Sequence, residues 1–219
     1  MKPLIFFDIN GTLITRDART DLPFSRAVDR FLGSEDGMAG VDTSARSDKD
    51  VFMEVLTNHK KQFTERRWDS FLSLYEEELK SFAESDIWRP NADACPFVQS
   101  LFERGYPLVL ITGELSMGAE YKLRKIGLWE YFITGGFGDD ALHRFGIAEA
   151  ARDKIEQRLG TLPDTLYVIG DTVLDIRTAR HLNARAVAIT TGSHFREKLL
   201  NENPDYCIDS FKDIISLFV

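Results

Sequence analysis

The sequence is poor in cysteine, in long apolar runs and in net positive charge, and each shortage excludes a class of protein. Cys95 and Cys207 are the two cysteines among 219 residues, too few and too far apart for a disulfide framework, so we expect two reduced thiols. No apolar run reaches the length of a bilayer-spanning helix, and the run near the N-terminus is too short for a signal peptide. We therefore expect a cytoplasmic protein with no membrane partner.

The formal charge of −8 argues against a nucleic-acid partner, because phosphate backbones are held by clustered Lys and Arg. A small phosphate ester is still permitted, since it needs only a few local cations or a metal. Apolar residues make up 43% and charged residues 28% of the chain, which is typical of a soluble globular enzyme. The length suits one substantial domain, or a core domain that carries a smaller insertion.

Short apolar runs alternate with helical patterns along most of the chain. One helical pattern covers Ala94 to Phe102 with Gly105 as its C-terminal cap, another opens at Asp175, and the segment from Phe211 to Phe218 closes the chain with an amphipathic turn or two. The apolar runs are typical of strands buried on both faces, and they lie at residues 4–7, 108–111, 167–169 and 186–189. This alternation predicts an α/β fold with a Rossmann-like parallel-sheet core, formed by residues 1–15 and 87–219.

Residues 16–86 contain no strand-like run and predict an inserted, all-helical cap domain. Pro23 suits the first turn of one helix, while Ser47 and Thr64 could cap two more. Six apolar residues are spaced as one face of the third helix, and we interpret this stripe as a packing face rather than a ligand site: Trp68, Phe71, Leu72, Tyr75, Leu79 and Phe82.

Polar residues follow four of the predicted strands. Each could be an ordinary turn, but the carboxyl ends of parallel strands meet at one edge of a sheet, where ligands gather. Three carboxylates converging there would repel each other unless a cation lay among them, and hard oxygen ligands suit Mg²⁺. The residues concerned are Asp8, Thr112 with Gly113, Asp171 with Asp175, and the segment 190–193.

Three motifs in this order resemble the haloacid dehalogenase-like hydrolase superfamily, and the resemblance covers nearly the whole chain, including the helical cap. They are Phe7-Asp8-x-x-Gly11-Thr12-Leu13, Ile111-Thr112-Gly113 and Ile169-Gly170-Asp171-Thr172-x-x-Asp175. Within the superfamily the chain looks most similar to the phosphoglycolate phosphatase and β-phosphoglucomutase group. This resemblance implies a magnesium-dependent phosphatase that acts on a small phosphorylated metabolite.

The resemblance also implies roles for the acidic residues. Asp8 would attack the phosphorus and become an aspartyl phosphate. A magnesium ion would be held by the Asp8 carboxylate, the backbone carbonyl of Asn10 and Asp171. Asp175 would be a further ligand or an anchor for the other groups.

Other residues would bind the phosphoryl group or the rest of the substrate. The Thr112 hydroxyl and the Gly113 N–H would hold phosphoryl oxygens. The family also uses a Lys or Arg to neutralise the phosphoryl group, and we expect Arg144 rather than Lys154, because its fork can bind phosphate bidentately. In the cap, Arg46 could reach a substrate carboxylate or a second phosphate, or it could be an ordinary surface residue.

The chain departs from the family at position 10, where phosphatases carry an Asp that protonates the leaving oxygen and then activates water. Asn10 cannot exchange a proton in this way, so general acid–base help of about 10²–10⁴ in rate should be lost. The Asn could be engineered, it could be natural with another proton donor or slow turnover, or the protein could bind a phosphorylated ligand without chemistry.

Two further alternatives involve transfer or cleavage of other kinds. A phosphoglucomutase-type enzyme would return the phosphate to its substrate. A phosphonoacetaldehyde hydrolase-like enzyme would need a cap lysine, and Lys49, Lys60 and Lys61 are available. A dehalogenase is disfavoured because such enzymes need no metal, whereas this chain keeps Asp171 and Asp175.

Overall fold

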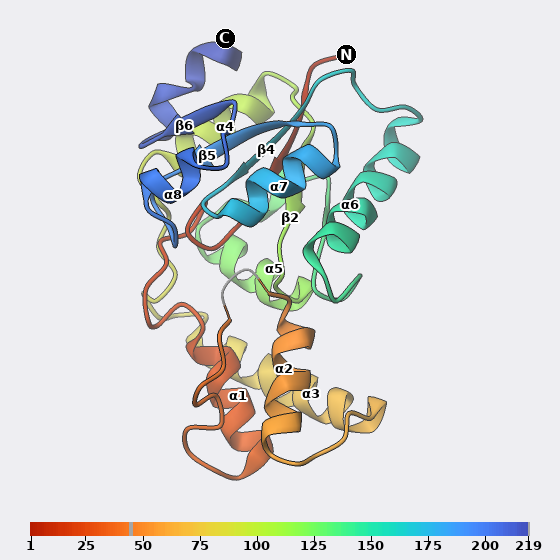
Figure 1. The fold of residues 1–219 in the computed structure, drawn as a ribbon. Coiled ribbons are helices and arrows are strands. Elements are labelled where there is room, and N and C mark those ends of the chain that lie inside the picture. The colour runs from red at the N-terminus through yellow and green to blue at the C-terminus, as the bar shows by residue number, and fades with distance from the viewer. Residues whose placement is uncertain (44–45, 219) are drawn as a thin grey trace.

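Six parallel strands form one sheet in the order β3-β2-β1-β4-β5-β6 (Figure 1). The structure is a computed structural model that describes residues 1–43 and 46–218. It confirms the predicted parallel-sheet core and adds the two short edge strands, β3 and β6, to the predicted four. The strands are β1 Leu4–Phe7, β2 Leu108–Ile111, β3 Thr134–Gly136, β4 Leu166–Gly170, β5 Arg185–Ile189 and β6 Tyr206–Ile208.

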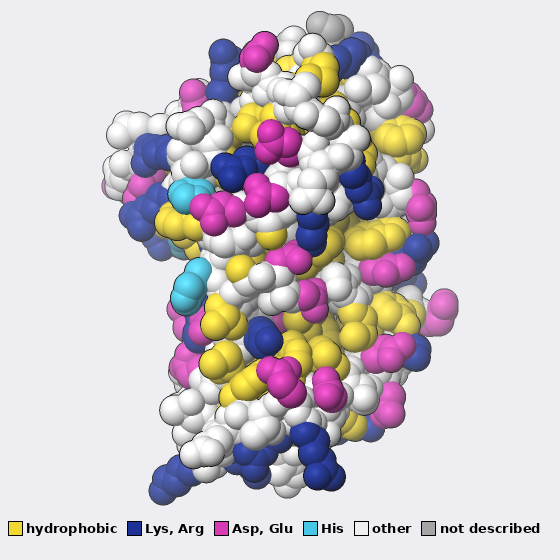
Figure 2. Space-filling view, turned by 90° about the vertical axis from the view of Figure 1, so that its right-hand side faces the viewer, with side chains coloured by type: hydrophobic (Ala, Val, Ile, Leu, Met, Phe, Trp, Pro, Cys, Tyr) yellow, Lys and Arg dark blue, Asp and Glu magenta, His cyan; other side chains and the backbone are white. Residues whose placement is uncertain are grey.

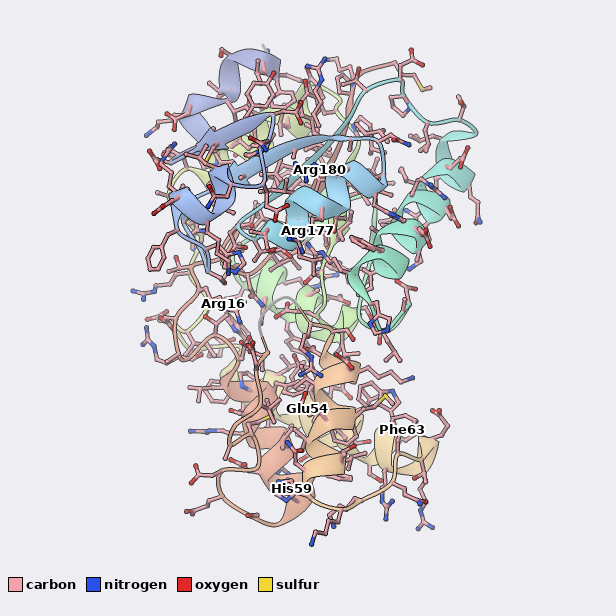
Figure 3. The ribbon with its side chains drawn as sticks, viewed as in Figure 1. Arg16, Glu54, His59, Phe63, Arg177 and Arg180 are labelled. Atoms are coloured by element: carbon pink, nitrogen blue, oxygen red, sulfur yellow. The ribbon has the colours of Figure 1, made fainter. Side chains whose placement is uncertain are left out.

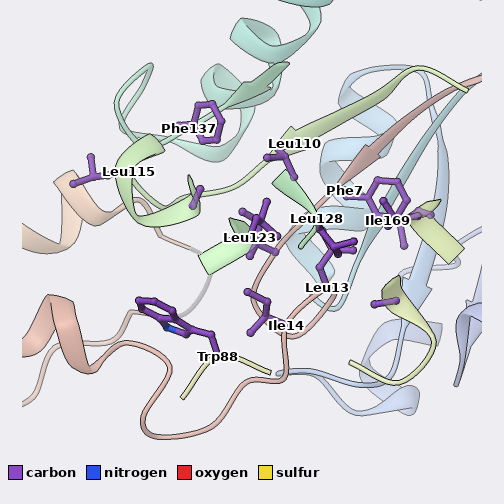
Figure 4. Close-up of a cluster of buried hydrophobic side chains, with 14 of the residues drawn as sticks. Phe7, Leu13, Ile14, Trp88, Leu110, Leu115, Leu123, Leu128, Phe137 and Ile169 are labelled. Atoms are coloured by element: carbon purple, nitrogen blue, oxygen red, sulfur yellow. The ribbon is translucent and has the colours of Figure 1, made fainter. Parts of the chain in front are cut away.

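Helices cover both faces of the sheet, and the alternation of side chains along β1 explains why. Leu4 and Phe6 belong to one buried cluster, which includes side chains of α6 and α7. Ile5 and Phe7 belong to the other, which includes side chains of α4 and α5 (Figure 4). A central strand therefore has to be apolar at every position. The helices are α4 Ala94–Glu103, α5 Ser116–Lys125, α6 Arg144–Leu159, α7 Val173–His181 and α8 Arg196–Leu200.

Helix α7 begins two residues earlier than the sequence indicated. Thr172 caps it, because its hydroxyl accepts a hydrogen bond from the Asp175 N–H while the Asp175 carboxylate accepts one from the Thr172 N–H. This capping box satisfies two backbone donors that the first turn leaves free. The chain ends in two 3₁₀ turns, Phe211–Asp213 and Ile215–Phe218, and a third 3₁₀ turn covers Trp129–Tyr131.

The three helices α1 Leu22–Leu32, α2 Asp48–Asn58 and α3 Glu65–Phe82 gather at one end of the molecule, away from the α/β layers (Figure 1). Ser47 and Thr64 cap α2 and α3, as predicted. Phe71, on the apolar stripe of α3, stacks on Phe52 with ring centroids 4.3 Å apart, so the stripe packs the helices together. The domain boundaries, with residues 16–86 as the cap and residues 1–15 and 87–219 as the core, stay a proposal.

Two connections that run side by side link these helices to the α/β layers. Ile14 forms an antiparallel bridge with Pro90, and the Thr15 N–H donates to the Arg89 carbonyl at 2.9 Å. Figure 4 shows Ile14 near Trp88, a fully buried side chain of the second connection. The paired connections hold the helical insertion over the carboxyl ends of the central strands.

The surface carries charges of both signs. Figure 2 shows Lys and Arg side chains interspersed with Asp, Glu and apolar side chains on one face, rather than gathered along a stripe. None of the helices within residues 1–43 and 46–218 combines the length and apolar character needed to cross a membrane. Both cysteines are free thiols, and each is half-buried.

Candidate active site

Asp8 and Asp171 lie side by side at the carboxyl edge of the sheet, because β1 and β4 are neighbouring strands. The Thr12 hydroxyl oxygen lies 3.4 Å from Oδ2 of Asp8 and 3.3 Å from Oδ1 of Asp171. Both carboxylates are buried. The structure thus brings together the first and third motifs of the sequence, at the edge where a parallel sheet collects ligands.

Two glycines let the backbone approach the Asp171 carboxylate. A Cβ atom on Gly11, whose φ is +86°, would lie 2.5 Å from Oδ2 of Asp171, and one on Gly192 would lie 2.0 Å from the same atom. The Ser193 N–H donates a hydrogen bond of 2.5 Å to this oxygen. The carboxylate is therefore fixed by loops that any larger residue would push away.

Arg144, the first residue of α6, points its guanidinium at the nucleophile candidate. Its Nη2 donates to Oδ1 of Asp8 at 3.0 Å and also to Oδ1 of Asp175, and its side chain is 8% exposed. Its Nε is buried and has no hydrogen-bond partner among the described residues. Lys154 lies elsewhere: it pairs with Asp140 at 2.7 Å, and its side chain is 39% exposed. Of the two cations considered from the sequence, Arg144 is the one at the site.

The buried carboxylates have shifted proton affinities. Burial raises the pKa of Asp8 well above its usual range, and the neighbouring Asp175 and Asp171 raise it further, while Arg144 opposes the rise. Burial and Asp175 also raise the pKa of Asp171 to about 6, against the effect of the Ser193 N–H. More negative charge is therefore gathered here than Arg144 alone compensates, which favours binding of a further cation.

These residues fit Mg²⁺ with few protein ligands. No group of three or more His, Cys, Asp or Glu side chains is arranged to hold a metal ion in the described part of the chain. Mg²⁺ needs no such cage, because it keeps several waters and binds through one or two carboxylates together with substrate phosphate. Asp8, Asp171 and the Asn10 carbonyl could supply that set. The Asp175 oxygens already accept from Arg144 and Thr172, so Asp175 suits the role of an anchor.

Mg²⁺ should stabilise the protein more at pH 8 than at pH 5. The folded pKa of Asp171, about 6, exceeds the unfolded value of about 3.9, so the metal-free fold binds the extra proton and loses stability as pH rises through this window. Mg²⁺ relieves the resulting charge. The Mg²⁺ concentration is held at about 100 times the Kd found at pH 8. We then expect the Tm to rise by roughly 5–10 °C at pH 8 and by less than half of that at pH 5. Calorimetry of the protein and of Asp171→Asn checks this; equal shifts at both pH values would contradict it.

The N-terminus of α2 sits directly on the loop after β2. The Asp48 N–H donates to the Gly113 carbonyl at 2.9 Å, and the Asp48 carboxylate accepts from the Leu115 N–H at 2.9 Å. A Cβ atom on Gly113 would lie 2.1 Å from the Arg46 carbonyl oxygen. Glycine at position 113 is therefore required by the close approach of the helical insertion, in addition to any role in binding phosphate.

A cavity of about 240 Å³ lies between the sheet edge and the helical insertion. Its size suits a small ligand. From the sheet edge it is lined by Asp8, Asn10, Thr112, Gly113, Arg144, Asp171 and Asp175, and from the insertion by residues that include Arg16, Asp21, Phe24, Met38 and Tyr75. Tyr75 belongs to the apolar stripe of α3, so that stripe serves both packing and the cavity wall.

The predicted substrate contact, Arg46, has its guanidinium engaged by acidic residues of α2. Its Nε donates to Asp50 at 2.7 Å, and its Nη1 pairs with Glu54. Arg16 also lines the cavity. Its polar contacts among the described residues are longer, with Thr43 Oγ1 at 3.5 Å and an Asp21 oxygen at 3.9 Å. Figure 3 shows Arg16 at the junction between the α/β layers and the insertion, with Glu54 lower on α2.

Glu114 and Lys122, the groups around Asn10, were not predicted from the sequence. The Asn10 amide nitrogen donates to Oε1 of Glu114 at 2.7 Å, and Lys122 pairs with the same carboxylate. The Nζ atom of Lys122 also lies 3.4 Å from Oδ1 of Asn10 and 3.5 Å from Oδ1 of Asp21. Burial opposes its charge, but Glu114 and Asp21 outweigh that effect and raise the pKa of Lys122. The sequence position of Glu114, directly after Thr112-Gly113, could have pointed to the site. Lys122 lies in a basic segment of α5 and has no such signal.

Comparison with known proteins gives the same family as the motifs. The model of the haloacid dehalogenase-like hydrolases matches residues 5–180. The "Probable phosphatase IndB" of Dickeya dadantii is 24% identical over 98% of this chain and 93% of its own. A phosphoglycolate phosphatase of Pectobacterium atrosepticum is 25% identical, and the match covers 96% of this chain and 90% of the relative. The crystal structure of a "predicted phosphoglycolate phosphatase" from Haemophilus somnus shares the fold, with a TM-score of 0.70, 19% identity and coverage of 99% and 97%.

Proposed function

The chain belongs to the haloacid dehalogenase-like hydrolase family, and from this premise we propose that it is a phosphatase that hydrolyses a phosphate ester of a small metabolite. The observation that carries the proposal is the Arg144 guanidinium 3.0 Å from Asp8, with Asp171 beside them. One cation, one nucleophile and one candidate metal ligand meet at the cavity floor. Relatives named as phosphatases, IndB and phosphoglycolate phosphatase, support the same reaction class.

In the first step an Asp8 carboxylate oxygen attacks the phosphorus, giving an aspartyl phosphate. The bond from phosphorus to the leaving oxygen breaks with its electron pair on that oxygen, which takes up a proton from water and leaves as the alcohol. Arg144 holds Asp8 in place and turns its unpartnered Nε–H toward a group such as a phosphoryl oxygen, which would satisfy it. Thr112 and Gly113 offer a hydroxyl and an N–H at the same floor. Mg²⁺, when bound by Asp8, Asp171 and the Asn10 carbonyl, would shield the nucleophile from the charge of the phosphate.

In the second step a water oxygen attacks the phosphorus, and the bond between phosphorus and Asp8 breaks. Inorganic phosphate leaves, and the Asp8 carboxylate is regenerated. Asn10 cannot accept the proton of that water, so position 10 lacks an acid–base contribution of about 10²–10⁴ in rate. We propose that turnover is slower than it would be with a full acid–base pair, whether the Asn is natural or engineered.

The substrate must be small, since the cavity holds about 240 Å³. Because Asp50 and Glu54 neutralise Arg46, we place Arg16 ahead of Arg46 as the cation that would meet a second anionic group of the substrate. A cytoplasmic location is proposed as well, in keeping with the free thiols of Cys95 and Cys207.

A phosphate-release screen tests the function. We expect Mg²⁺-dependent release of inorganic phosphate from p-nitrophenyl phosphate and, more efficiently, from at least one small phosphate among phosphoglycolate, sugar phosphates and pyrophosphate. EDTA should abolish release, and added Mg²⁺ should restore it. The absence of phosphate release from the whole panel, with Mg²⁺ present and the protein folded, would overturn the proposal.

The same screen separates the alternatives left open by Asn10. A binding relative would show thermal stabilisation by a phosphorylated ligand without release, and a phosphoglucomutase-type enzyme would return phosphate to its substrate. A phosphonoacetaldehyde hydrolase-like enzyme needs an unprotonated lysine in the cavity. Lys122 lines the cavity, but its raised pKa favours the protonated form, and Lys49 faces the rings of Phe63 and Trp68 instead.

A further inference from the structure

Glu114 occupies an unusual place in the cavity between the sheet and the insertion. It directly follows Thr112-Gly113, is 6% exposed, and lines the same cavity as Asp8 and Arg144. Its Oε1 atom lies 2.7 Å from the side-chain nitrogen of Asn10. That nitrogen stands where the family's usual Asp would have a carboxylate oxygen, so a carboxyl group is present one hydrogen bond away from the position that lacks one.

The two oxygens of Glu114 have different surroundings. Oε1 accepts hydrogen bonds from Asn10 and from Lys122. Oε2 is buried, and no hydrogen-bond donor among the described residues reaches it. A buried carboxylate oxygen without a donor is costly. Such an atom is explained most simply by a donor that arrives with the ligand, such as a water molecule in the cavity.

Asn10 and Lys122 are well suited to hold Glu114 in this place. The Asn10 amide presents its N–H to Glu114 and its carbonyl oxygen to Lys122. An Asp at position 10 would instead put a carboxylate oxygen about where the amide nitrogen now lies, 2.7 Å from Glu114, and the two like charges would repel. The amide at position 10 thus matches its neighbours.

We propose that Glu114 is a catalytic residue of this site, the base for the water that hydrolyses the phosphorylated Asp8. This inference rests on the proposed phosphatase function. Oε2 of Glu114 takes a proton from the water while the water oxygen bonds to phosphorus. The bond between phosphorus and Asp8 breaks and leaves its electron pair on the Asp8 oxygen. The products are phosphate, the Asp8 carboxylate and protonated Glu114, which then returns the proton to solvent or to the next leaving oxygen.

Glu114→Gln tests the proposal, because it keeps the shape but removes the base. Pre-steady-state release of p-nitrophenol from p-nitrophenyl phosphate separates the two steps. We expect a burst close to one equivalent per active site, followed by turnover slowed by about 10²-fold or more. Glu114→Asp should restore part of the rate. Glu120→Gln is the matched control, since Glu120 is an exposed residue of α5 paired with Arg124, and its turnover should be unchanged.

An exchange of the two groups gives a second test. In the double variant Asn10→Asp/Glu114→Gln a carboxylate and an amide still face each other, but in swapped positions. We expect turnover of this double variant to be at least tenfold faster than turnover of Glu114→Gln. Asn10→Asp alone should lower turnover, because its new carboxylate lies against Glu114 and the two like charges repel.

Three results would overturn the role of Glu114 while leaving the phosphatase intact. They are unchanged turnover in Glu114→Gln, a loss of the burst together with the steady-state rate in a folded Glu114→Gln protein, and an increase of 10²-fold or more in Asn10→Asp alone. Failure of the phosphatase proposal itself looks different, because the unmodified protein would then release neither p-nitrophenol nor phosphate.

Discussion

Replacing Asp8 by Asn is expected to lower phosphate release by more than about 10⁴-fold, the largest effect of any single substitution in the chain. The amide is a poor nucleophile, so no aspartyl phosphate forms, and one of the oxygen ligands proposed for Mg²⁺ is weakened at the same time. Steady-state release from the best substrate of the screen measures the loss. Residual activity within a factor of ten of the unmodified protein would show that another group attacks the phosphorus.

The Asp8→Asn variant should nevertheless be folded. Burial and the neighbouring acids raise the pKa of Asp8 well above its usual range, which means that the charged side chain is unfavourable in the metal-free protein. Removing that charge should leave the Tm without Mg²⁺ unchanged or slightly higher. Thermal unfolding in EDTA checks this, and it separates a loss of chemistry from a loss of structure.

Arg144→Gln is expected to lower kcat/KM by about 10³-fold, within the range known for losing a group that stabilises charge in the transition state. Arg144 holds Asp8 and Asp175 through one nitrogen, and its buried Nε has no hydrogen-bond partner among the described residues. Arg144→Lys keeps the charge but loses the fork, so its loss should be smaller, about tenfold to 10²-fold.

Lys154→Gln is the matched control for Arg144→Gln. Lys154 lies on the same helix, but it pairs with Asp140 and is 39% exposed. Its replacement should change kcat/KM by less than about threefold, since an exposed ion pair contributes little. A large loss in Lys154→Gln with a small one in Arg144→Gln would reverse the assignment of the phosphate-binding cation.

Much of the fold was predictable from local patterns. The central strands are continuous apolar runs because the sheet is buried on both faces, and the caps Ser47 and Thr64 marked the starts of α2 and α3. Strand β3 escaped prediction because it is only Thr134–Gly136 and two of its residues are glycine. It is specified by pairing with β2 rather than by its own propensity.

The site was predictable only where it follows strand ends. Asp8, Thr112 and Asp171 meet because their strands are neighbours in a parallel sheet. Arg144 could be ranked above Lys154 from its side chain, but its contact with Asp8 comes from the placement of α6. Lys122 shows the limit most clearly: its sequence context is that of a surface helix, yet its side chain is buried against Glu114 and Asn10.

Trapping the phosphoenzyme tests the central claim most directly. The protein would be mixed with Mg²⁺ and its best substrate, quenched in acid within the first turnovers, and reduced with borohydride, which converts an aspartyl phosphate to homoserine. Mass spectrometry of the N-terminal peptide should then find homoserine at position 8, and none in a quench without substrate. Steady turnover with no modification at Asp8, or with modification at another residue, would contradict the account.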